Sequence, residues 1–402
     1  MSRRSVAGNA AVLLAANLLA GVLNYCFQLR AASRLDLASY GSLNVWMAWL
    51  NLAMILGTAL QFASNFHPLK TAGLKRLGWA LWLLGPGVLI LTSNLAYPEN
   101  TPGVLGFLTL VLGLAYHLAL GQLQGRFQFI WLGLGIVVPA CLKFAVAFWP
   151  GVVEPGTLWW ALPASYALAL VVLGFGVLTL AAGKGSENFS AGSASPRRLR
   201  ENLPSSLVLA SAFALAPQLD LLNLTQIHSP EVLGQYVRAA LFSKAIFFGA
   251  STLLQLALPY HIAEARGVRE SGLKASRHSM LRLWEAAGLL LCLAGALVFS
   301  AVGPWITSRF LGFEVTEPRW ILLSCLSLTS WYGVLQRLQV DCALGRWKRA
   351  TIVLAAVLLF SAGIQAAQPS EVTRYLAWAT AFYAALGAPS FLSIFRPRQV
   401  HA

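Results

Sequence analysis

The sequence predicts an all-α, polytopic membrane protein with about twelve transmembrane helices in two six-helix bundles. Hydrophobic residues make up 57% of its 402 positions, and charged residues only 11%. The mean hydropathy is +0.66, and apolar runs of about 20 residues recur, each long enough to cross the hydrocarbon core of a bilayer. These runs lack the alternation of a transmembrane β-barrel, so the backbone must satisfy its hydrogen bonds by forming helices.

The first apolar run follows Arg3 and Arg4 and exceeds the roughly 7–15 residues of a signal-peptide core. Because it leads straight into another span, we expect it to be a retained first helix. The sequence Gly-Pro-Gly at 85–87 predicts a kink in the third helix. The first six helices are expected at 6–29, 40–66, 76–97, 103–125, 127–149 and 157–182.

A Gly/Ser-rich polar stretch, GKGSENFSAGSASPRRLREN at 183–202, divides the chain. We expect this linker to join an N-terminal six-helix bundle, 1–182, to a C-terminal six-helix bundle, 203–402. The second six helices are expected at 203–227, 231–258, 279–302, 318–340, 348–367 and 372–395.

The two halves of the sequence resemble each other weakly. In the first half, SYGSL at 39–43 starts a helix that ends at His67-Pro68. In the second half, VLGQY at 232–236 starts a helix that ends at PYH, residues 259–261. Internal repeats of this kind are common in transporters, which place the substrate site at the repeat interface. The sequence therefore indicates a 6+6 pseudo-repeat.

The distribution of the net charge of +15 predicts the orientation of the helices. With a cytoplasmic N-terminus, 21 of the 29 basic residues lie in inside segments and only five in outside loops. This asymmetry follows the positive-inside rule for an even number of spans, with both termini and the linker in the cytoplasm. Orientation in the membrane accounts for the basic composition, so we expect no nucleic-acid partner.

Three charges, Asp220, Arg238 and Lys244, lie within an apolar hairpin at 215–259. A charge at the bilayer centre costs on the order of 2.5–3.5 kcal/mol, so each needs a partner, a water-filled cavity or a ligand. With a turn at 229–230, Asp220 and Arg238 are level across an antiparallel pair of helices. We expect these two to pair. Lys244 has no acidic residue at its level in the hairpin, and we expect it to bind an anionic ligand.

Three further basic residues are candidate contributors to the same positive field. Arg30 and Arg34 lie at the end of the first helix, where snorkelling to the membrane interface is the alternative explanation. Lys143 lies about two turns from the outer end of the fifth helix, so it either snorkels outward or faces the cavity.

Polar side chains recur at helical spacings in three of the predicted spans. The candidates are Asn24 and Gln28 in the first span, Asn44 and Asn51 in the second, and Ser251 and Gln255 in the eighth. Spacings of four and seven place such residues on one face of a helix. We expect these amides and hydroxyls to line a solvated cavity together with the basic residues. Interhelical hydrogen bonding is the alternative explanation.

The five cysteines share no metal-like spacing, and four of them lie within apolar runs. We expect packing residues rather than a metal site. No cofactor is expected, and the choice between a proton, a sodium ion and no coupling ion stays open.

A series of short motifs carries a family resemblance. The arginine-bearing end of the first helix leads into YGSL, and Asp220 leads through LGQY to ALPYHIAEA at 257–265. GPWITSRFLG at 303–312 and ALGRWKR at 343–349 follow. In this order the motifs resemble those of the polysaccharide flippases of the multidrug/oligosaccharidyl-lipid/polysaccharide exporter superfamily. The sequence departs from that family in QAAQPSEVTRYLAW at 365–378, where a glycine-rich pattern of small residues is expected.

The resemblance implies two six-helix bundles that open alternately to the two sides of a bacterial inner membrane. It implies that the cargo is an isoprenoid diphosphate carrying an oligosaccharide repeat unit, moved to the periplasmic leaflet for cell-surface polysaccharide synthesis. The expected partners are this anionic lipid-linked glycan, membrane lipids and other polysaccharide assembly proteins, and the chain itself is expected to be a monomer. The candidate residues suit such a cargo, since cations match a diphosphate and amides match a sugar.

Two alternatives stay open. An ion-coupled multidrug or metabolite exporter of the same superfamily would favour buried acids for cationic substrates, whereas the intramembrane bases here outnumber Asp220. A membrane glycan polymerase or acyltransferase would need a larger external loop or paired His, Asp or Glu groups within reach of each other. We therefore expect a transporter rather than an enzyme.

Overall fold

The computed structural model of the chain describes residues 3–66, 73, 75–77, 79–80, 83, 101–125, 128–149, 155–182, 196–215, 217–265, 274–315, 317–367 and 371–395. Within these ranges every regular element is a helix and no strand occurs. The prediction of an all-α fold is confirmed.

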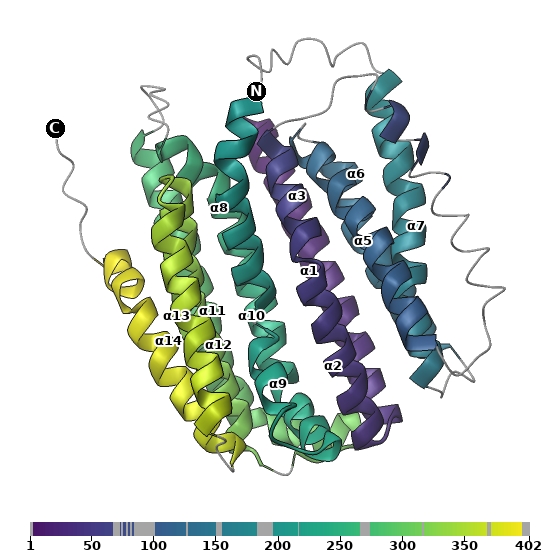
Figure 1. Cartoon of the computed structure of the whole chain (residues 1–402), viewed down its shortest axis with the longest axis vertical. Coiled ribbons are helices and arrows are strands. Elements are labelled where there is room, and N and C mark those ends of the chain that lie inside the picture. Colours follow the sequence, from purple (N-terminus) through teal and green to yellow (C-terminus); the bar gives the residue numbers. More distant parts are fainter. Residues whose placement is uncertain are drawn as a thin grey trace. The chain divides into compact units, whose positions relative to one another are not determined.

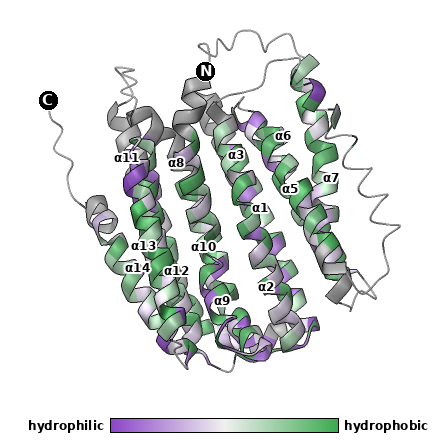
Figure 2. Ribbon diagram, in the orientation of Figure 1, coloured by the Kyte–Doolittle hydropathy of each residue, from purple (hydrophilic) through white to green (hydrophobic). Residues whose placement is uncertain are grey.

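Apolar residues cover most of the length of the helices, as Figure 2 shows for α5 (Thr101–Gly125), α7 (Pro155–Ala182) and α13 (Trp347–Ala367). In the described part of the chain, seven helical segments are long and apolar enough to cross a membrane. Each predicted span coincides with one helix or with two successive helices, except 76–97, most of which lies outside the described residues. The chain is a multi-pass membrane protein.

The chain forms two compact units, of which the first comprises Met1–Leu35 and Trp49–Ala210. Its helices are α1 (Arg3–Arg34), α3 (Ile55–Phe66), α5, α6 (Phe129–Phe148), α7 and most of α8 (Pro196–Leu215). In this unit α6 packs against α1 and α7, and α5 packs against α3 and α7. Leucine side chains such as Leu112, Leu132 and Leu170 form the core between α5, α6 and α7.

The second unit comprises Asp36–Ala48 and Ser211–Ala402. Its elements are most of α2 (Leu37–Ala53), α9 (Leu219–Leu224), α10 (Pro230–Ala265), α11 (Lys274–Ile306), the π-helix η2 (Thr307–Leu311), α12 (Arg319–Ala343), α13 and α14 (Val372–Phe395). Here α12 packs against α10, α11 and α14, with α13 beside it (Figure 1). The division of the chain at 183–202, inferred from composition, stays a prediction.

The span expected at 203–227 is two helices rather than one. α8 ends and α9 begins on either side of the buried Pro217. A proline has no backbone N–H and clashes with the preceding turn, so it can interrupt a helix. Helical hydrogen bonding resumes where the carbonyl of Gln218 accepts from the N–H of Leu222. Asp220 lies just after this break, in the first turn of α9.

The two motifs equated in the sequence, SYGSL and VLGQY, contact each other within the second unit. A Cβ on Gly41 of α2 would lie only 2.5 Å from the carbonyl oxygen of Pro230. A Cβ on Gly234 of α10 would collide with the carbonyl oxygen of Leu37. Small residues permit this close approach of two helix backbones. The first turns of α2 and α10 are therefore in backbone contact.

Candidate functional site

Asp220 is a buried acid in the first turn of α9. The hydroxyl of Tyr236, on α10, donates a hydrogen bond to one carboxylate oxygen. The N–H of Leu221 donates to the other carboxylate oxygen at 2.8 Å. Because the side chain has little access to water, these two donors are what satisfies it in the described structure.

Lys244 is a half-buried base on α10. The carboxylate of Asp220 lies within electrostatic range of its ammonium group. With respect to the residues that the structure describes, Lys244 makes no hydrogen bond and no ion pair. An ammonium group held among apolar helices with one counter-charge in range is available to an anionic ligand.

Arg238 has partners other than the predicted Asp220. Its guanidinium lies over the ring of Phe313, 4.9 Å from the ring centroid. It also interacts electrostatically with Tyr40 and Asp36, which belong to the same compact unit. α9 ends at Leu224 and a turn follows it, so the uninterrupted helix up to Ser229-Pro230 that the expected pairing with Asp220 assumes is absent, and the pairing stays a prediction.

A second polar cluster surrounds Asn223, one turn after Asp220 on α9. The amide of Asn223 donates to the hydroxyl of Tyr375 on α14 at 2.9 Å. Its oxygen accepts from Ser361 and Gln365 of α13, at 2.6 and 2.9 Å. The cluster ties α9 to α13 and α14. We did not expect this cluster from the sequence, although two polar residues three positions apart in an apolar run indicate a shared helix face.

The first unit carries basic side chains on packed helices. The guanidinium of Arg30, on α1, lies over the ring of Phe148 on α6, 5.4 Å from the centroid. Lys143 lies one turn after the buried Pro139 and is itself half-buried. Arg34, at the end of α1, is exposed. No acidic residue is present among the side chains that the structure describes in this unit.

The amide side chains that were expected to line a cavity lie in different surroundings. Asn24 and Gln28 are half-buried on α1 of the first unit. Asn51 is exposed, whereas Asn44 is buried in the second unit, where its amide donates to the carbonyl of Tyr40 at 3.0 Å. A shared cavity lined by these four amides stays a prediction.

The polar helix face expected along α10, formed by Ser251 and Gln255, is described only in part. The hydroxyl of Ser251 is buried and donates to the carbonyl of Phe248 at 3.1 Å, so its own helix satisfies it. The side chain of Gln255 lies outside the described residues. Of the predicted site residues, the structure brings together Asp220 and Lys244 in the second unit.

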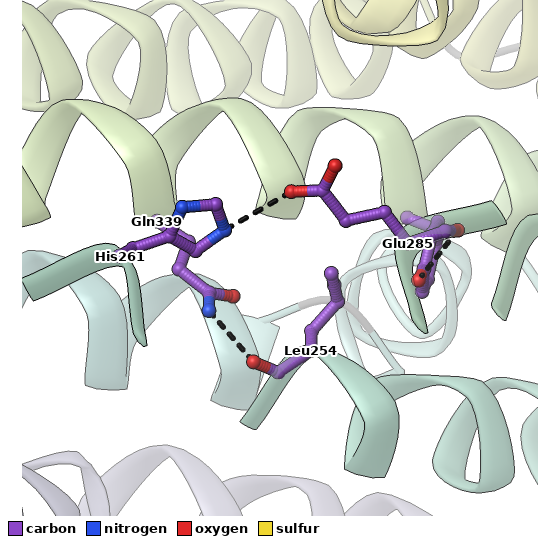
Figure 3. Close-up of polar contacts among 5 residues, drawn as sticks. Leu254, His261, Glu285 and Gln339 are labelled. Carbon is purple, nitrogen blue, oxygen red and sulfur yellow. Dashed lines mark hydrogen bonds and ion pairs between the residues drawn. The ribbon is translucent and has the colours of Figure 1, made fainter. Parts of the chain in front are cut away.

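Two histidines, one in each unit, have different partners. Nδ1 of His117, on α5, lies 2.8 Å from Oε1 of Gln61 on α3. Nε2 of His261, on α10, lies 3.0 Å from Oε1 of Glu285 on α11 (Figure 3). We did not expect the second pair from the sequence. Its signal is a histidine near the end of one predicted span and an acid near the start of the next.

No group of three or more His, Cys, Asp or Glu side chains in the described part of the chain is placed to hold a metal ion. The cysteines Cys292, Cys325 and Cys342 are buried, Cys26 is half-buried and Cys141 is exposed. Their packing roles stay a prediction.

Comparisons with known proteins identify the fold. No protein-family model and no curated protein sequence matches the chain. A MOP superfamily transporter from Pyrococcus furiosus superimposes with a TM-score of 0.59 at 11% identity, over 96% of this chain and 94% of that chain. An outward-facing multidrug resistance MATE family transporter gives 0.60 at 12% identity, over 96% and 94%. The eukaryotic MATE transporter AtDTX14 gives 0.53 at 15% identity, over 98% and 96%.

These likenesses extend along nearly the whole chain, and the matched proteins are transporters rather than enzymes. Inward-facing and outward-facing MATE transporters are both among them. At such low identities the likeness concerns the fold, which is enough to connect the helix order described above with a known architecture. The chain has the fold of the MOP superfamily transporters.

Proposed function

We propose that this protein is a secondary transporter that moves an anionic substrate across the membrane by alternating access. The observation that carries the proposal is the charge imbalance of the first unit. Arg30 and Lys143 lie there on the packed helices α1 and α6, and none of that unit's described side chains is acidic. Bases without counter-charges among apolar helices attract anions. In the second unit Lys244 adds a further half-buried base.

The substrate class that fits these groups is an isoprenoid diphosphate that carries an oligosaccharide repeat unit. A diphosphate forms charge-assisted contacts with basic side chains. The half-buried amides of Asn24 and Gln28 offer donors and acceptors to sugar hydroxyls, although Gln28 also has a contact within the protein. The motif order of the sequence, which resembles that of polysaccharide flippases, supports the same substrate.

The orientation that goes with this function places both termini in the cytoplasm and the protein in a bacterial inner membrane. The distribution of basic residues between alternate loops supports this orientation. In it, Arg30 and Arg34 lie near the outer face, whereas His261 and Glu285 lie toward the cytoplasm. The protein acts as a monomer among membrane lipids, with other polysaccharide assembly proteins supplying and consuming its cargo.

A second candidate is an ion-coupled multidrug exporter, because several of the similar structures are multidrug MATE transporters. Among the candidate site residues, Asp220 is the acid that would attract a cationic drug. The absence of acids among the described side chains of the first unit argues against this candidate. For the Pyrococcus furiosus transporter, a reversed polarity of the binding pocket has been taken to suggest a different function, and the basic unit here is an observation of the same kind.

Transport of two fluorescent probes by proteoliposomes separates the candidates. One probe is a synthetic isoprenoid-diphosphate oligosaccharide, and the other is ethidium, a cationic drug. We expect Lys143→Ala and Lys244→Ala to slow the anionic probe by about tenfold or more, which is the loss of one charge-assisted contact. Lys244→Arg keeps the charge and is expected to retain part of the rate.

Lys348→Ala is the matched control, since it removes an exposed base at the start of α13. We expect it to transport the anionic probe at the wild-type rate. Wild-type rates for both Lys143→Ala and Lys244→Ala would contradict the anionic site. Transport of ethidium without the anionic probe would favour the second candidate.

A further inference from the structure

A buried acid–base pair joins α10 to α11 at a place that the proposed substrate site does not use. His261 lies near the end of α10 and is 6% exposed, and Glu285 lies near the start of α11 and is 7% exposed. Their facing atoms, Nε2 and Oε1, are 3.0 Å apart (Figure 3). The pair therefore spans the connection between two successive long helices.

The third helix, α12, fixes the backbones on both sides of the pair. The hydroxyl of Tyr332 donates to the carbonyl of Glu285 at 3.2 Å, and the amide of Gln339 donates to the carbonyl of Leu254 at 2.6 Å (Figure 3). A Cβ on Gly288 would collide with the Tyr332 hydroxyl, so glycine makes room for this contact. The His261–Glu285 pair links α10 to α11 at this end, and the stacked rings of Phe242 and Phe299 link the two helices further along.

Other titratable or charged side chains lie on the helices that pack around the pair. Within the described residues they are Glu231, Tyr236, Arg238 and Lys244 on α10, Cys292 on α11, Arg319, Cys325, Tyr332, Arg337, Asp341 and Cys342 on α12, Arg374, Tyr375 and Tyr383 on α14, and Glu371 just before α14. The guanidinium of Arg337 donates to the carbonyl of Leu386 on α14 at 3.1 Å. Among the side chains that the structure describes, the base in contact with the Glu285 carboxylate is His261.

The proton count of this pair decides its net charge. With one proton between them, the two groups are neutral together, as imidazolium with carboxylate or as imidazole with carboxylic acid. A second proton, bound by the Glu285 carboxylate, leaves an imidazolium beside a neutral acid. A buried charge without a counter-charge is costly, and the cost falls when the helix ends separate and admit water. Protonation therefore weakens the contact between α10 and α11.

α10 connects this pair to the basic site of the same unit. It is one continuous helix that carries Gly234 near one end, Lys244 in the middle and His261 near the other end. At 1.5 Å per residue, Gly234 and His261 lie about 40 Å apart along the axis. Between these ends the stacked rings of Phe242 and Phe299 also join α10 to α11, so release at His261 lets the two helices pivot about that contact. Such a pivot turns the part of α10 that carries Lys244.

We propose that His261 and Glu285 form the proton-binding site that couples transport to a proton gradient in this protein. The proposal rests on the transport function proposed above and names the coupling ion for it. Uptake of the second proton releases α10 from α11, and its loss restores the contact. Each cycle of the pair thus changes the position of the helix that carries Lys244.

The first experiment needs no substrate. Spin labels replace the exposed Phe248 of α10 and Leu283 of α11 in a variant without native cysteines, and the distance between them is measured in lipid nanodiscs between about pH 5 and 8. In the otherwise unchanged protein we expect a longer-distance population to grow as the pH falls. His261→Gln and Glu285→Gln are expected to abolish this pH dependence. His117→Gln, which alters the histidine that faces an amide, is the matched control and is expected to retain it.

A pH-independent distance in the unmutated protein would overturn the proposal, and so would a pH dependence that survives both His261→Gln and Glu285→Gln. The second readout is the stimulation of anionic-probe transport by an imposed pH gradient, which we expect both variants to lose while His117→Gln keeps it. The double variant His261→Gln/Glu285→Gln places two amides opposite each other. Because two amides can hydrogen-bond, this variant controls for misfolding of the single variants. The expected distance changes without any transport of the anionic probe would support the proton site and refute the anionic substrate.

Discussion

The two compact units differ in whether the charged side chains on their helices face partners among the described residues. In the first unit, Arg30 and Lys143 lie among helices whose described side chains include no acid. In the second unit, Asp220 accepts from Tyr236, and Glu285 faces His261. Compensated charges can hold helices together, whereas uncompensated charges require solvent or a ligand. We infer that the first unit contributes mainly to ligand binding and the second mainly to the conformational change.

The histidines repeat this difference. His117 meets the neutral amide of Gln61, so a proton on its ring gains no counter-charge from that partner. His261 meets the carboxylate of Glu285, so a proton on its ring completes an ion pair. The same side chain therefore serves as a neutral hydrogen-bonding group in one unit and as half of an acid–base pair in the other.

The largest loss of stability is expected from Asp220→Ala in the compensated unit. It removes the acceptor of the buried Tyr236 hydroxyl and the counter-charge of Lys244 together. An unsatisfied buried hydroxyl costs roughly 1–3 kcal/mol, and the stranded ammonium adds to that cost. We expect a lower apparent Tm in detergent and less folded protein in the membrane. Asp220→Asn keeps an oxygen acceptor and is expected to lose less stability. An unchanged apparent Tm in both variants would contradict the view that the second unit is held together by compensated charges.

The next effect is expected at Gly234 of α10, which packs against the first turn of α2 within the second unit. Gly234→Ala places a methyl group against the carbonyl oxygen of Leu37, and overpacking of this kind costs about 1–3 kcal/mol. Gly249→Ala, on the same helix, is the matched control, because its Cβ would lie 3.5 Å from Leu291, an ordinary contact. We expect a lower apparent Tm for Gly234→Ala and an unchanged or higher one for Gly249→Ala. Equal values would show that the α2–α10 contact contributes no stability.

A smaller effect is expected from two matched lysine substitutions, one in each unit. Lys244→Met leaves Asp220 without a counter-charge, and we expect it to lower the free energy of unfolding by about 1 kcal/mol. Lys143→Met removes a base for which its unit has no described acid, and we expect a change of no more than about 0.5 kcal/mol. Thermal unfolding in detergent measures both. A loss for Lys143→Met as large as that for Lys244→Met would mean that the first unit also compensates its charges.

The sequence predicts the helices well where apolar runs have clear ends. The spans expected at 103–125, 127–149 and 157–182 coincide closely with α5, α6 and α7. Hydropathy alone does not predict the break within 203–227, because the residues on both sides are equally apolar. Pro217 is the local signal for it, and its effect on the backbone outweighs the continuity of the apolar run.

The candidate site is predictable in its residue types but not in its pairings. Asp220 and Lys244 stand out in the sequence as charges inside apolar runs. Tyr236 does not, because its ring counts as apolar and tertiary packing decides which acceptor its hydroxyl meets. His261 and Glu285 lie on different predicted spans, and periodicity within one helix cannot relate residues on two helices.

The smallest effect is expected at Asp36, an exposed residue just before α2 in the second unit. The backbone N–H of Ser39 donates to its carboxylate at 2.9 Å, which caps the start of the helix and lowers the pKa of Asp36. Because the pKa in the folded protein lies below that of the unfolded chain, the carboxylate stabilises the fold at pH values above the ordinary pKa of aspartate. This contribution is lost as the pH falls through the folded-state pKa.

Asp36→Ala is therefore expected to lower the apparent Tm slightly at neutral pH, with a deficit that shrinks toward acid pH. The same carboxylate lies in electrostatic range of Arg238, so the deficit also reports on compensation in the second unit. Asp36→Asn keeps a capping acceptor without the charge, and its apparent Tm is expected to fall between those of the wild type and Asp36→Ala. Thermal unfolding of the three proteins across the pH range measures these differences. A deficit of Asp36→Ala that stays constant with pH would show that the carboxylate charge plays no part.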